Sequence, residues 1–177
     1  MNHLTFILGG ARSGKSRFAL ERGEAFAKKI FIATAQPTDE EMVRRIERHR
    51  RERPEGWETI ESPLHLSEAL RSLKGKAEVA VIDCLTLWLS NLLATFGENE
   101  EKILEEIDRG LQAARSAPFS VIAVSNEVGM SIVPTDHSLS RFFRDLSGLL
   151  HQRWAAASDE VYWMMAGIAV PIKRKGP

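Results

Sequence analysis

The chain has 177 residues, of which 44% are hydrophobic and 27% are charged, proportions typical of a globular protein with a packed core. This length predicts a single domain spanning residues 1–177. Lys and Arg total 24, as do Asp and Glu, so no net charge draws the chain to nucleic acid or to an acidic membrane, and neither is expected as a partner.

Strands and helices are predicted to alternate along the chain. Short apolar runs bounded by turn residues are typical of buried strands, whereas apolar residues three or four positions apart are typical of helices. Strands are expected at 4–8, 29–34, 57–61, 78–83, 119–124, 160–165 and 168–172. Helices are expected over 16–27, from 38 to before Pro54, from 62 to about 73, over 85–96, through 103–111 and over 139–154.

Two of these helices begin with a capping signal. Thr38 and Glu41 have the spacing of a capping box, in which the side chain of Thr38 caps the helix. Ser62 followed by Pro63 predicts an N-cap with proline at the first helical position.

Strands alternating with helices predict an α/β fold with a mostly parallel sheet flanked by helices on both faces. The last two strands are separated only by Ala166 and Gly167, which predicts a hairpin. We therefore expect a C-terminal antiparallel strand at the edge of the sheet, where Pro171 is tolerated.

Gly9, Gly14, Lys15 and Ser16 have the spacing of a phosphate-binding loop, with a strand before it and a helix after it. The backbone N–H groups of such a turn wrap a phosphate chain at the positive end of a helix. Lys15 is then expected to reach the terminal phosphates, and the Ser16 hydroxyl to hold Mg²⁺. The alternative is a chance match in a glycine-rich turn. We predict a single P-loop NTPase domain that binds a nucleotide.

In a parallel sheet, ligands lie at the carboxyl ends of the strands, which selects residues 34–36, Asp83 and 125–127 as facing the site. Asp83 ends an apolar strand, where a carboxylate can hold Mg²⁺ or its water. The alternative role for Asp83 is an N-cap of the helix that begins near Leu85.

His49 has an unusual environment for a histidine. Met42, Ile46 and His49 share one helix face, which is expected to be the buried face, and residues 48–53 include four arginines. Guanidinium groups suit polyphosphate binding and would keep the imidazole neutral, so that it could attack phosphorus and form a covalent phosphoramidate. The alternative is a partly buried histidine at the end of an apolar stripe, with some of the arginines on a solvated helix end.

The other histidines lack such neighbours and are expected to be structural or exposed: His3, His65, His137 and His151. The single cysteine, Cys84, cannot form an internal disulfide, as is usual in a reducing cytosol. The first residues lead directly into a strand, without room for a signal peptide, and the apolar run 85–93 is too short to span a bilayer. We expect a cytoplasmic protein without a membrane span.

Several of these segments, in this order, resemble the bifunctional adenosylcobinamide kinase/adenosylcobinamide-phosphate guanylyltransferase family of cobalamin assembly. The similarity runs nearly end to end. The segments that carry it are Gly9-Gly-Ala-Arg-Ser-Gly-Lys-Ser16, Ile32-Ala-Thr-Ala-Gln36, Arg45-Ile46 before His49, Arg53-Pro54, Asn126-Glu-Val-Gly129, Ile132-Val-Pro134 and Arg141-Phe-Phe-Arg-Asp145.

The resemblance implies an enzyme with two reactions. A nucleoside triphosphate, ATP or GTP, first phosphorylates adenosylcobinamide, a corrinoid. GTP then guanylylates a histidine, and the substrate phosphate takes the GMP to give adenosylcobinamide-GDP. Some relatives have two adjacent histidines at this point, whereas this chain has Arg48-His49, so His49 is the one candidate. The resemblance also implies a homotrimer, and the corrinoid is large enough to need surface from a neighbouring subunit.

The resemblance further implies which residues act. His49 and Lys15 would be catalytic, and Ser16 and Asp83 would hold Mg²⁺. Relatives carry either Asp or Glu at the position of Asp83, which affects how directly it meets the metal. The nucleotide would contact Gly9, Gly10, Ala11, Arg12, Ser13, Gly14, Lys15, Ser16, Thr34, Ala35, Gln36, Arg50, Arg51, Glu52, Arg53, Glu61 and Asp83.

Three other functions are compatible with a phosphate-binding loop. A monofunctional small-molecule kinase would form a phosphorylated product without a covalent nucleotide, and His49 would be structural. A GTP-dependent switch or interaction module is disfavoured because the chain has no Asn-Lys-x-Asp guanine-reading motif. A nucleic-acid-stimulated ATPase is disfavoured by the balanced charge.

Overall fold

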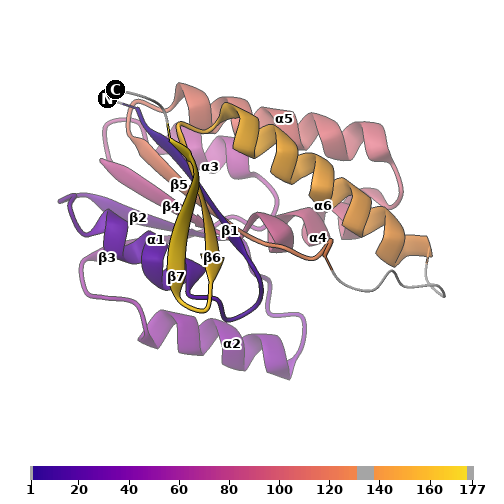
Figure 1. Ribbon diagram of the computed structural model, residues 1–177, viewed down its shortest axis with the longest axis horizontal. Helices are drawn as coiled ribbons and strands as arrows, with labels where there is room; N and C mark the ends of the chain where they lie inside the picture. Colours follow the sequence, from indigo (N-terminus) through magenta and orange to yellow (C-terminus); the bar gives the residue numbers. More distant parts are fainter. Residues whose placement is uncertain (1, 131–137, 175–177) are drawn as a thin grey trace.

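The computed structural model of the chain describes residues 2–130 and 138–174. Its strands form one sheet in the order β3-β2-β4-β5-β1-β6-β7 (Figure 1). Every neighbouring pair is parallel except β6 and β7, which are antiparallel. This confirms the predicted α/β class, with its antiparallel strand at a sheet edge. The strands are β1 (Leu4–Gly9), β2 (Lys29–Ala33), β3 (Trp57–Glu61), β4 (Val79–Asp83), β5 (Ser120–Asn126), β6 (Glu160–Met165) and β7 (Ile168–Arg174).

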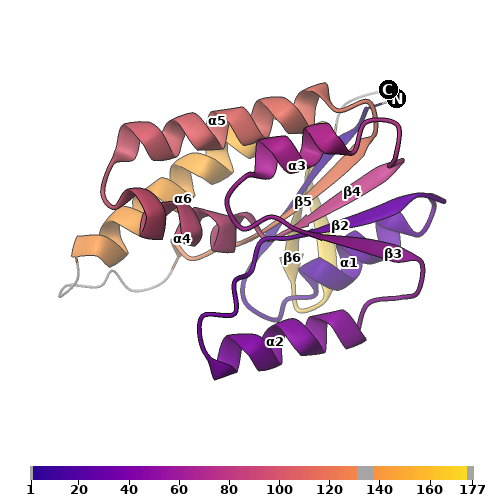
Figure 2. The same ribbon diagram turned by 180° about the vertical axis from the view of Figure 1, so that it is seen from behind.

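The helices cover the two faces of the sheet unequally. Buried side chains of α3, α4, α5 and α6 join one apolar cluster with β1, β2, β4 and β5, whereas α1 contributes to a second cluster on the other face. Both views show α2 standing apart from the other helices (Figures 1 and 2). The helices are α1 (Lys15–Gly23), α2 (Glu40–Arg51), α3 (Leu66–Ser72), α4 (Leu85–Phe96), α5 (Glu100–Ser116) and α6 (Ser138–Ala157).

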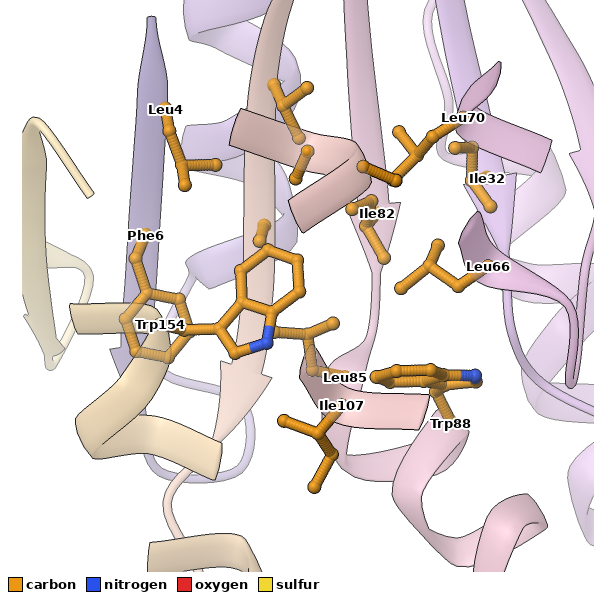
Figure 3. Close-up of a cluster of buried hydrophobic side chains, with 14 of the residues drawn as sticks. Leu4, Phe6, Ile32, Leu66, Leu70, Ile82, Leu85, Trp88, Ile107 and Trp154 are labelled. Atoms are coloured by element: carbon orange, nitrogen blue, oxygen red, sulfur yellow. The ribbon is translucent and has the colours of Figure 1, made fainter. Parts of the chain in front are cut away.

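Large aromatic and aliphatic side chains fill the main core between the sheet and the helices (Figure 3). Trp88 of α4 and Trp154 of α6 are completely buried there, beside Phe6 from β1 and Leu85 from α4. The indole N–H of Trp88 donates to the carbonyl of Leu64 at 2.8 Å, so this ring also holds the segment before α3. The rigid sheet and the α4 helix behind it therefore fix the strand ends on which the site is built.

Three predicted helix boundaries are wrong. The first helix ends at Gly23 rather than at 27, which leaves residues 24–28 to turn the chain into β2. The indole of Trp57 packs against Gly23 and would lie 2.4 Å from a Cβ there. Asp39, not Thr38, caps α2: its carboxylate accepts the N–H of Met42 at 2.8 Å. A carboxylate is a stronger acceptor than a hydroxyl at the positive end of a helix.

The third error concerns the Ser62-Pro63 pair. The N–H of Ser62 donates to the carbonyl of Ala33 at 2.8 Å and so continues the pairing of β3 with β2. The chain therefore still pairs with β2 at Ser62, and the helix begins later, at Leu66, with His65 at its N-cap.

The C-terminal hairpin has an exposed apolar side. Ala166 and Gly167 both have positive φ, as a tight two-residue turn requires, which agrees with the predicted hairpin. Met165 pairs with Ile168 across the turn, and strand alternation puts Val170 on the same face. We call the exposed side chains of Met165, Ile168, Val170 and Ile172 the C-terminal apolar strip; their exposed fractions are 61, 67, 42 and 60%.

Among the described residues, none of the helices has the length and apolar character needed to cross a membrane.

Candidate active site

The phosphate loop connects β1 to α1 and depends on two glycines. A Cβ at Gly9 would lie 2.5 Å from the carbonyl oxygen of Met164 in the neighbouring strand, so only glycine fits. Gly14 has φ +94°, a left-handed conformation, where it precedes the first turn of α1. The turn of the C-terminal hairpin also supports the loop, because the N–H of Gly167 donates to the carbonyl of Ser13 at 3.1 Å.

Lys15 is buried, and its ammonium group folds back over the loop. It donates to the carbonyl of Gly10 and, at 3.3 Å, to the hydroxyl of Ser13. Burial lowers the pKa of Lys15 from its ordinary 10.5, whereas the negative charge of Asp83 raises this pKa and the positive charge of Arg45 lowers it further. A cation held this way is available to a phosphate chain, whose charge would offset the cost of burying the ammonium.

Asp83 lies at the carboxyl end of β4, with 12% of its side chain exposed. Thr34 fixes the backbone beside it. The Thr34 hydroxyl donates to the carbonyl of Cys84 and accepts the N–H of Cys84, both at 2.8 Å, and the N–H of Thr34 donates to the carbonyl of Asp83 at 3.2 Å. The hydroxyl of Thr34 is therefore used to position the Asp83 segment.

The helix α2 carries His49 toward this strand end. Nδ1 of His49 lies 3.9 Å from Oδ2 of Asp83. The prediction that this face of α2 is buried is wrong. Met42, Ile46 and His49 are only half-buried, and α2 has no buried residue. These three side chains line an open cavity instead of the core. The apolar periodicity indicates the correct face of the helix but not what that face meets.

Arginines from the end of α2 and the following turn fold against β2 and β3. Arg50 forms an ion pair with Glu61, and Arg53 donates a hydrogen bond to Thr59. The guanidinium carbon of Arg53 lies 3.6 Å from the centre of the Phe31 ring, a cation–π contact. Burial lowers the pKa of Arg53, while Asp83 raises it. Nε of Arg53 is buried and has no hydrogen-bond partner among the described residues.

The loop, Asp83 and α2 enclose a cavity of about 810 Å³. Both basic and acidic side chains line this cavity, and the basic ones outnumber the acidic ones, although the whole chain has no net charge. A polyanion is the ligand class that this excess of cations favours. The cations that line it are Arg12, Lys15, Arg17, Arg45, Arg48, Arg50 and Arg53, and the acidic side chains are Glu41, Glu47, Glu52, Glu61 and Asp83.

The cavity brings together most of the residues selected from the sequence. The selected residues that line it are Ala11, Arg12, Ser13, Gly14, Lys15, Ser16, Ala35, His49, Arg50, Glu52, Arg53, Glu61 and Asp83. Gly9, Gly10, Thr34, Gln36 and Arg51 do not line it; Arg51 pairs instead with Glu47 along the helix at 3.2 Å. Phe31, Arg45 and Leu87 line the cavity without having been selected, because an apolar strand residue and a helix arginine carry no distinctive sequence signal.

The oxygen donors of Ser16 and Asp83 line the same cavity, and hydroxyl and carboxylate oxygens are the ligands that Mg²⁺ prefers. In the described part of the chain, no group of three or more His, Cys, Asp or Glu side chains could hold a metal ion. This donor set fits Mg²⁺, which keeps several waters and shares substrate phosphates, better than a metal that needs a full protein cage.

A buried polar network at the end of β5 has no counterpart in the predictions from sequence. The Thr86 hydroxyl lies 2.8 Å from the Ser125 hydroxyl, which lies 2.8 Å from Nε2 of His151. Nδ1 of His151 is 3.4 Å from a carboxylate oxygen of Glu127. Burial lowers the pKa of His151, and Glu127 raises it. His151 is thus structural, as expected, but it belongs to a specific chain of hydrogen bonds between α4, β5 and α6.

Comparisons with known proteins point to one family. The sequence profile of the family described as cobinamide kinase / cobinamide phosphate guanyltransferase matches residues 5–172. The chain is 40% identical over 181 residues to the bifunctional adenosylcobalamin biosynthesis protein CobU of Escherichia coli (strain K12), covering 96% of this chain and 99% of that protein. It is 44% identical over 169 residues to the corresponding protein CobP of Pseudomonas aeruginosa, covering 94% and 95%.

Two solved structures share the fold at low sequence identity. An ATPase from the type III secretion system of pathogenic bacteria superposes with a TM-score of 0.57 at 10% identity, over 91% of this chain and 50% of that one. The RadB recombinase superposes with a TM-score of 0.52 at 18% identity, over 91% and 73%. The present chain thus spans half of the secretion ATPase, and the likeness shows the fold alone.

Proposed function

The chain belongs to the cobinamide kinase / cobinamide phosphate guanyltransferase family, and from that premise we propose that His49 carries the guanylyl group from GTP to the substrate phosphate. The family resemblance seen in the sequence is confirmed. The protein is accordingly a bifunctional enzyme of cobalamin biosynthesis, a kinase that phosphorylates adenosylcobinamide and a guanylyltransferase that converts the phosphate to adenosylcobinamide-GDP.

The observation that carries the proposal is the position of His49 in the cavity, with Nδ1 3.9 Å from Asp83. With the carboxylate of Asp83 on the Nδ1 side of the ring, Nε2 is the nitrogen left to act as the nucleophile. Nε2 then attacks the α-phosphorus of GTP. The new N–P bond forms as the bond from the α-phosphorus to the α–β bridging oxygen breaks, and the electron pair leaves with pyrophosphate.

The charges of the cavity support both reactions. Lys15 and the loop N–H groups would hold the phosphates, with Ser16 and Asp83 as ligands of Mg²⁺. Bound Mg²⁺ would neutralise charge that develops on phosphate oxygens. Arg53 supports the assignment, since its buried Nε has no hydrogen-bond partner within the described residues and can donate to an anionic oxygen.

The test is incubation of the protein with α-labelled GTP and Mg²⁺, followed by mass mapping of any covalent adduct. We expect one acid-labile GMP on the peptide that contains His49, and none with His49→Ala. The matched control is His65→Ala, since His65 is exposed and does not line the main cavity. It should label like the wild type.

A GMP adduct that persists in His49→Ala would disprove the assignment of the nucleophile. If the wild-type protein phosphorylates adenosylcobinamide but forms no covalent GMP adduct, the protein is a kinase without the guanylyltransferase activity.

The proposal also covers how adenosylcobinamide is bound and how the subunits assemble. Adenosylcobinamide is too large for the cavity to hold together with a nucleotide, so we propose that subunits of a homotrimer, located in the cytoplasm, share its binding. The C-terminal apolar strip is exposed surface of the kind that self-association covers. Light scattering after size-exclusion chromatography should give three times the chain mass, and a mass of one chain at micromolar concentration would contradict this.

A further inference from the structure

Asn126 lies between the phosphate loop and the strand end that carries Asp83. It ends β5, which lies between β4 and β1 in the sheet. Its register partner in β1 is Gly9, the first residue of the phosphate loop, and Val124, two residues earlier, pairs with Asp83. The next residue, Glu127, donates its N–H to the carbonyl of Gly9 at 3.0 Å. Asn126 also lines the cavity.

The backbone of Asn126 is held on both sides by one buried hydroxyl. The N–H of Asn126 donates to Oγ1 of Thr86 at 2.8 Å, and the carbonyl of Asn126 lies within 3.1 Å of the same hydroxyl. Thr86 in turn contacts Ser125, which contacts His151, whose far nitrogen faces Glu127. Buried and mutually satisfied polar groups of this kind fix a single geometry.

The side chain of Asn126, by contrast, has little to bind within the protein. In the described ranges, its one side-chain hydrogen bond runs from the amide nitrogen to Sγ of Cys84, at 3.6 Å. A thiol sulfur is a weak acceptor. The result is an amide with two N–H donors, carried by a firmly held backbone beside the phosphate loop and open to the cavity.

We propose that Asn126 is a catalytic residue of the kinase reaction, whose side-chain amide donates to a γ-phosphate oxygen of the bound triphosphate. Thr86, Ser125, His151 and Glu127 are positioning residues that hold this amide in place. The proposal rests on the kinase activity of the family and not on the role of His49.

The chemistry of the step explains why a donor at this position matters. The hydroxyl oxygen of the acceptor bonds to the γ-phosphorus, the bond to the β–γ bridging oxygen breaks, and its electron pair leaves with the nucleoside diphosphate. The hydroxyl proton passes to solvent. Charge shifts over the γ-phosphoryl oxygens during this transfer, and a donor fixed in advance stabilises it without reorganising.

The experiment compares Asn126→Ala and Asn126→Asp with the wild type in two measurements. One is the kcat of label transfer from γ-labelled ATP or GTP to adenosylcobinamide, with Mg²⁺. The other is the affinity for GTP and, separately, for GDP. We expect kcat to fall roughly 100-fold in Asn126→Ala, the usual loss for one such donor. GTP affinity should fall about tenfold with GDP affinity unchanged, because only GTP has a γ-phosphate.

Asn126→Asp keeps the volume of the side chain but puts a carboxylate beside the phosphate, so its kcat should fall at least as far. Thr86→Val should lower kcat about threefold to tenfold, as expected for a positioning residue, and Thr86→Ser should restore most of it. The matched controls are Asn99→Ala and Thr95→Val, which remove the same groups outside the cavity and should leave kcat unchanged.

A kcat within threefold of the wild type in Asn126→Ala, or an equal loss of GTP and GDP affinity, would overturn the proposal. So would a wild-type kcat in Asn126→Asp. The same comparison made in a His49→Ala background keeps guanylylation of His49 out of the GTP measurements, so failure of that assignment leaves this result readable.

Discussion

The phosphate loop requires glycine at both Gly9 and Gly14, for different physical reasons. At Gly9 the obstacle is the backbone of β6, whose Met164 carbonyl oxygen would lie 2.5 Å from a Cβ and cannot move without disturbing the sheet. At Gly14 there is room, with the nearest atom at 3.4 Å, but φ is +94°. A side chain is therefore excluded by contact at one position and by backbone strain at the other.

These reasons predict different costs for the same substitution. Gly9→Ala should lower the free energy of unfolding by about 1–3 kcal/mol, as overpacking does, and Gly14→Ala by about 1–2 kcal/mol. Gly148→Ala is the matched control, because Gly148 lies within α6 and a Cβ there would meet nothing within 4 Å. It should stabilise the protein by about 0.5–1 kcal/mol. Urea unfolding measures all three, and a Gly9→Ala protein as stable as wild type would contradict the packing argument.

Glu78 links the turn after α1 to the start of β4. Its carboxylate accepts the N–H groups of Ala27, at 2.8 Å, and Lys28, at 3.3 Å, and these bonds lower its pKa below the ordinary 4.5. The folded state thus favours the ionised form. Its contribution to stability is complete above pH 4.5 and is lost as pH falls through the lower folded-state pKa.

Glu78→Gln should therefore be less stable than wild type at pH 7, and the difference should shrink below pH 4.5. The test is to measure the melting temperatures of Glu78→Gln and of the wild type from about pH 3 to about pH 7, the range in which carboxyl groups titrate. Glu58→Gln, which removes an exposed carboxylate of β3 by the same substitution, is the matched control. A difference that stays constant over this range would mean that Glu78 acts without its charge.

At the scale of elements, α2 differs from the other helices because it carries His49 and yet has no buried residue. Such a helix can open without unfolding the core. Asp39→Ala removes its N-cap, which costs about 1 kcal/mol of helix stability. We expect faster hydrogen exchange in 40–51 and slower guanylylation, with little change in the melting temperature.

The control for that prediction is Asn99→Ala, which removes the N-cap of α5, where the side chain accepts the N–H of Lys102 at 3.1 Å. Five residues of α5 are buried, so loss of this cap should lower the melting temperature and leave exchange in α2 unchanged. If both variants lowered the melting temperature equally, α2 would be part of the cooperative core.

Elements that depend on residues close together in the sequence were predicted correctly, whereas features that depend on distant residues were not. The helix 85–96 and the hairpin at Ala166-Gly167 were predicted correctly, since apolar spacing and turn residues act within a few positions. The caps at Thr38 and Ser62 were wrong because the neighbouring Asp39 accepts the N–H of Met42 and because strand pairing continues through Ser62. The network from Thr86 to His151 joins residues far apart in sequence, and a single sequence gives no signal for such pairs.

At the scale of the whole molecule, the strand order explains how the site arises. The phosphate loop follows β1 and Asp83 ends β4, and only β5 lies between these two strands in the sheet. The chain between β2 and β3 supplies α2. Parallel strands bring these ends to one edge of the sheet. The phosphate loop and the strand end at Asp83 were predictable from local sequence. The distance of His49 from Asp83 was not, because it depends on how α2 crosses that edge.

Because the cavity joins several elements, a bound nucleotide should stabilise the whole fold. With Mg²⁺ and GTP at roughly 100 times the Kd, linkage gives about 2.7 kcal/mol, or roughly 5–11 °C in Tm for a chain of this size. Lys15→Ala should lose most of this shift, since Lys15 is the buried cation of the loop. Lys102→Ala, an exposed lysine of α5, should keep it. Replacing Mg²⁺ by EDTA should reduce the shift in the wild type, because the negative charge of the phosphates would no longer be offset by the proposed metal ion. Thermal unfolding monitored by circular dichroism measures each case, and a full shift in Lys15→Ala would place the nucleotide outside this loop.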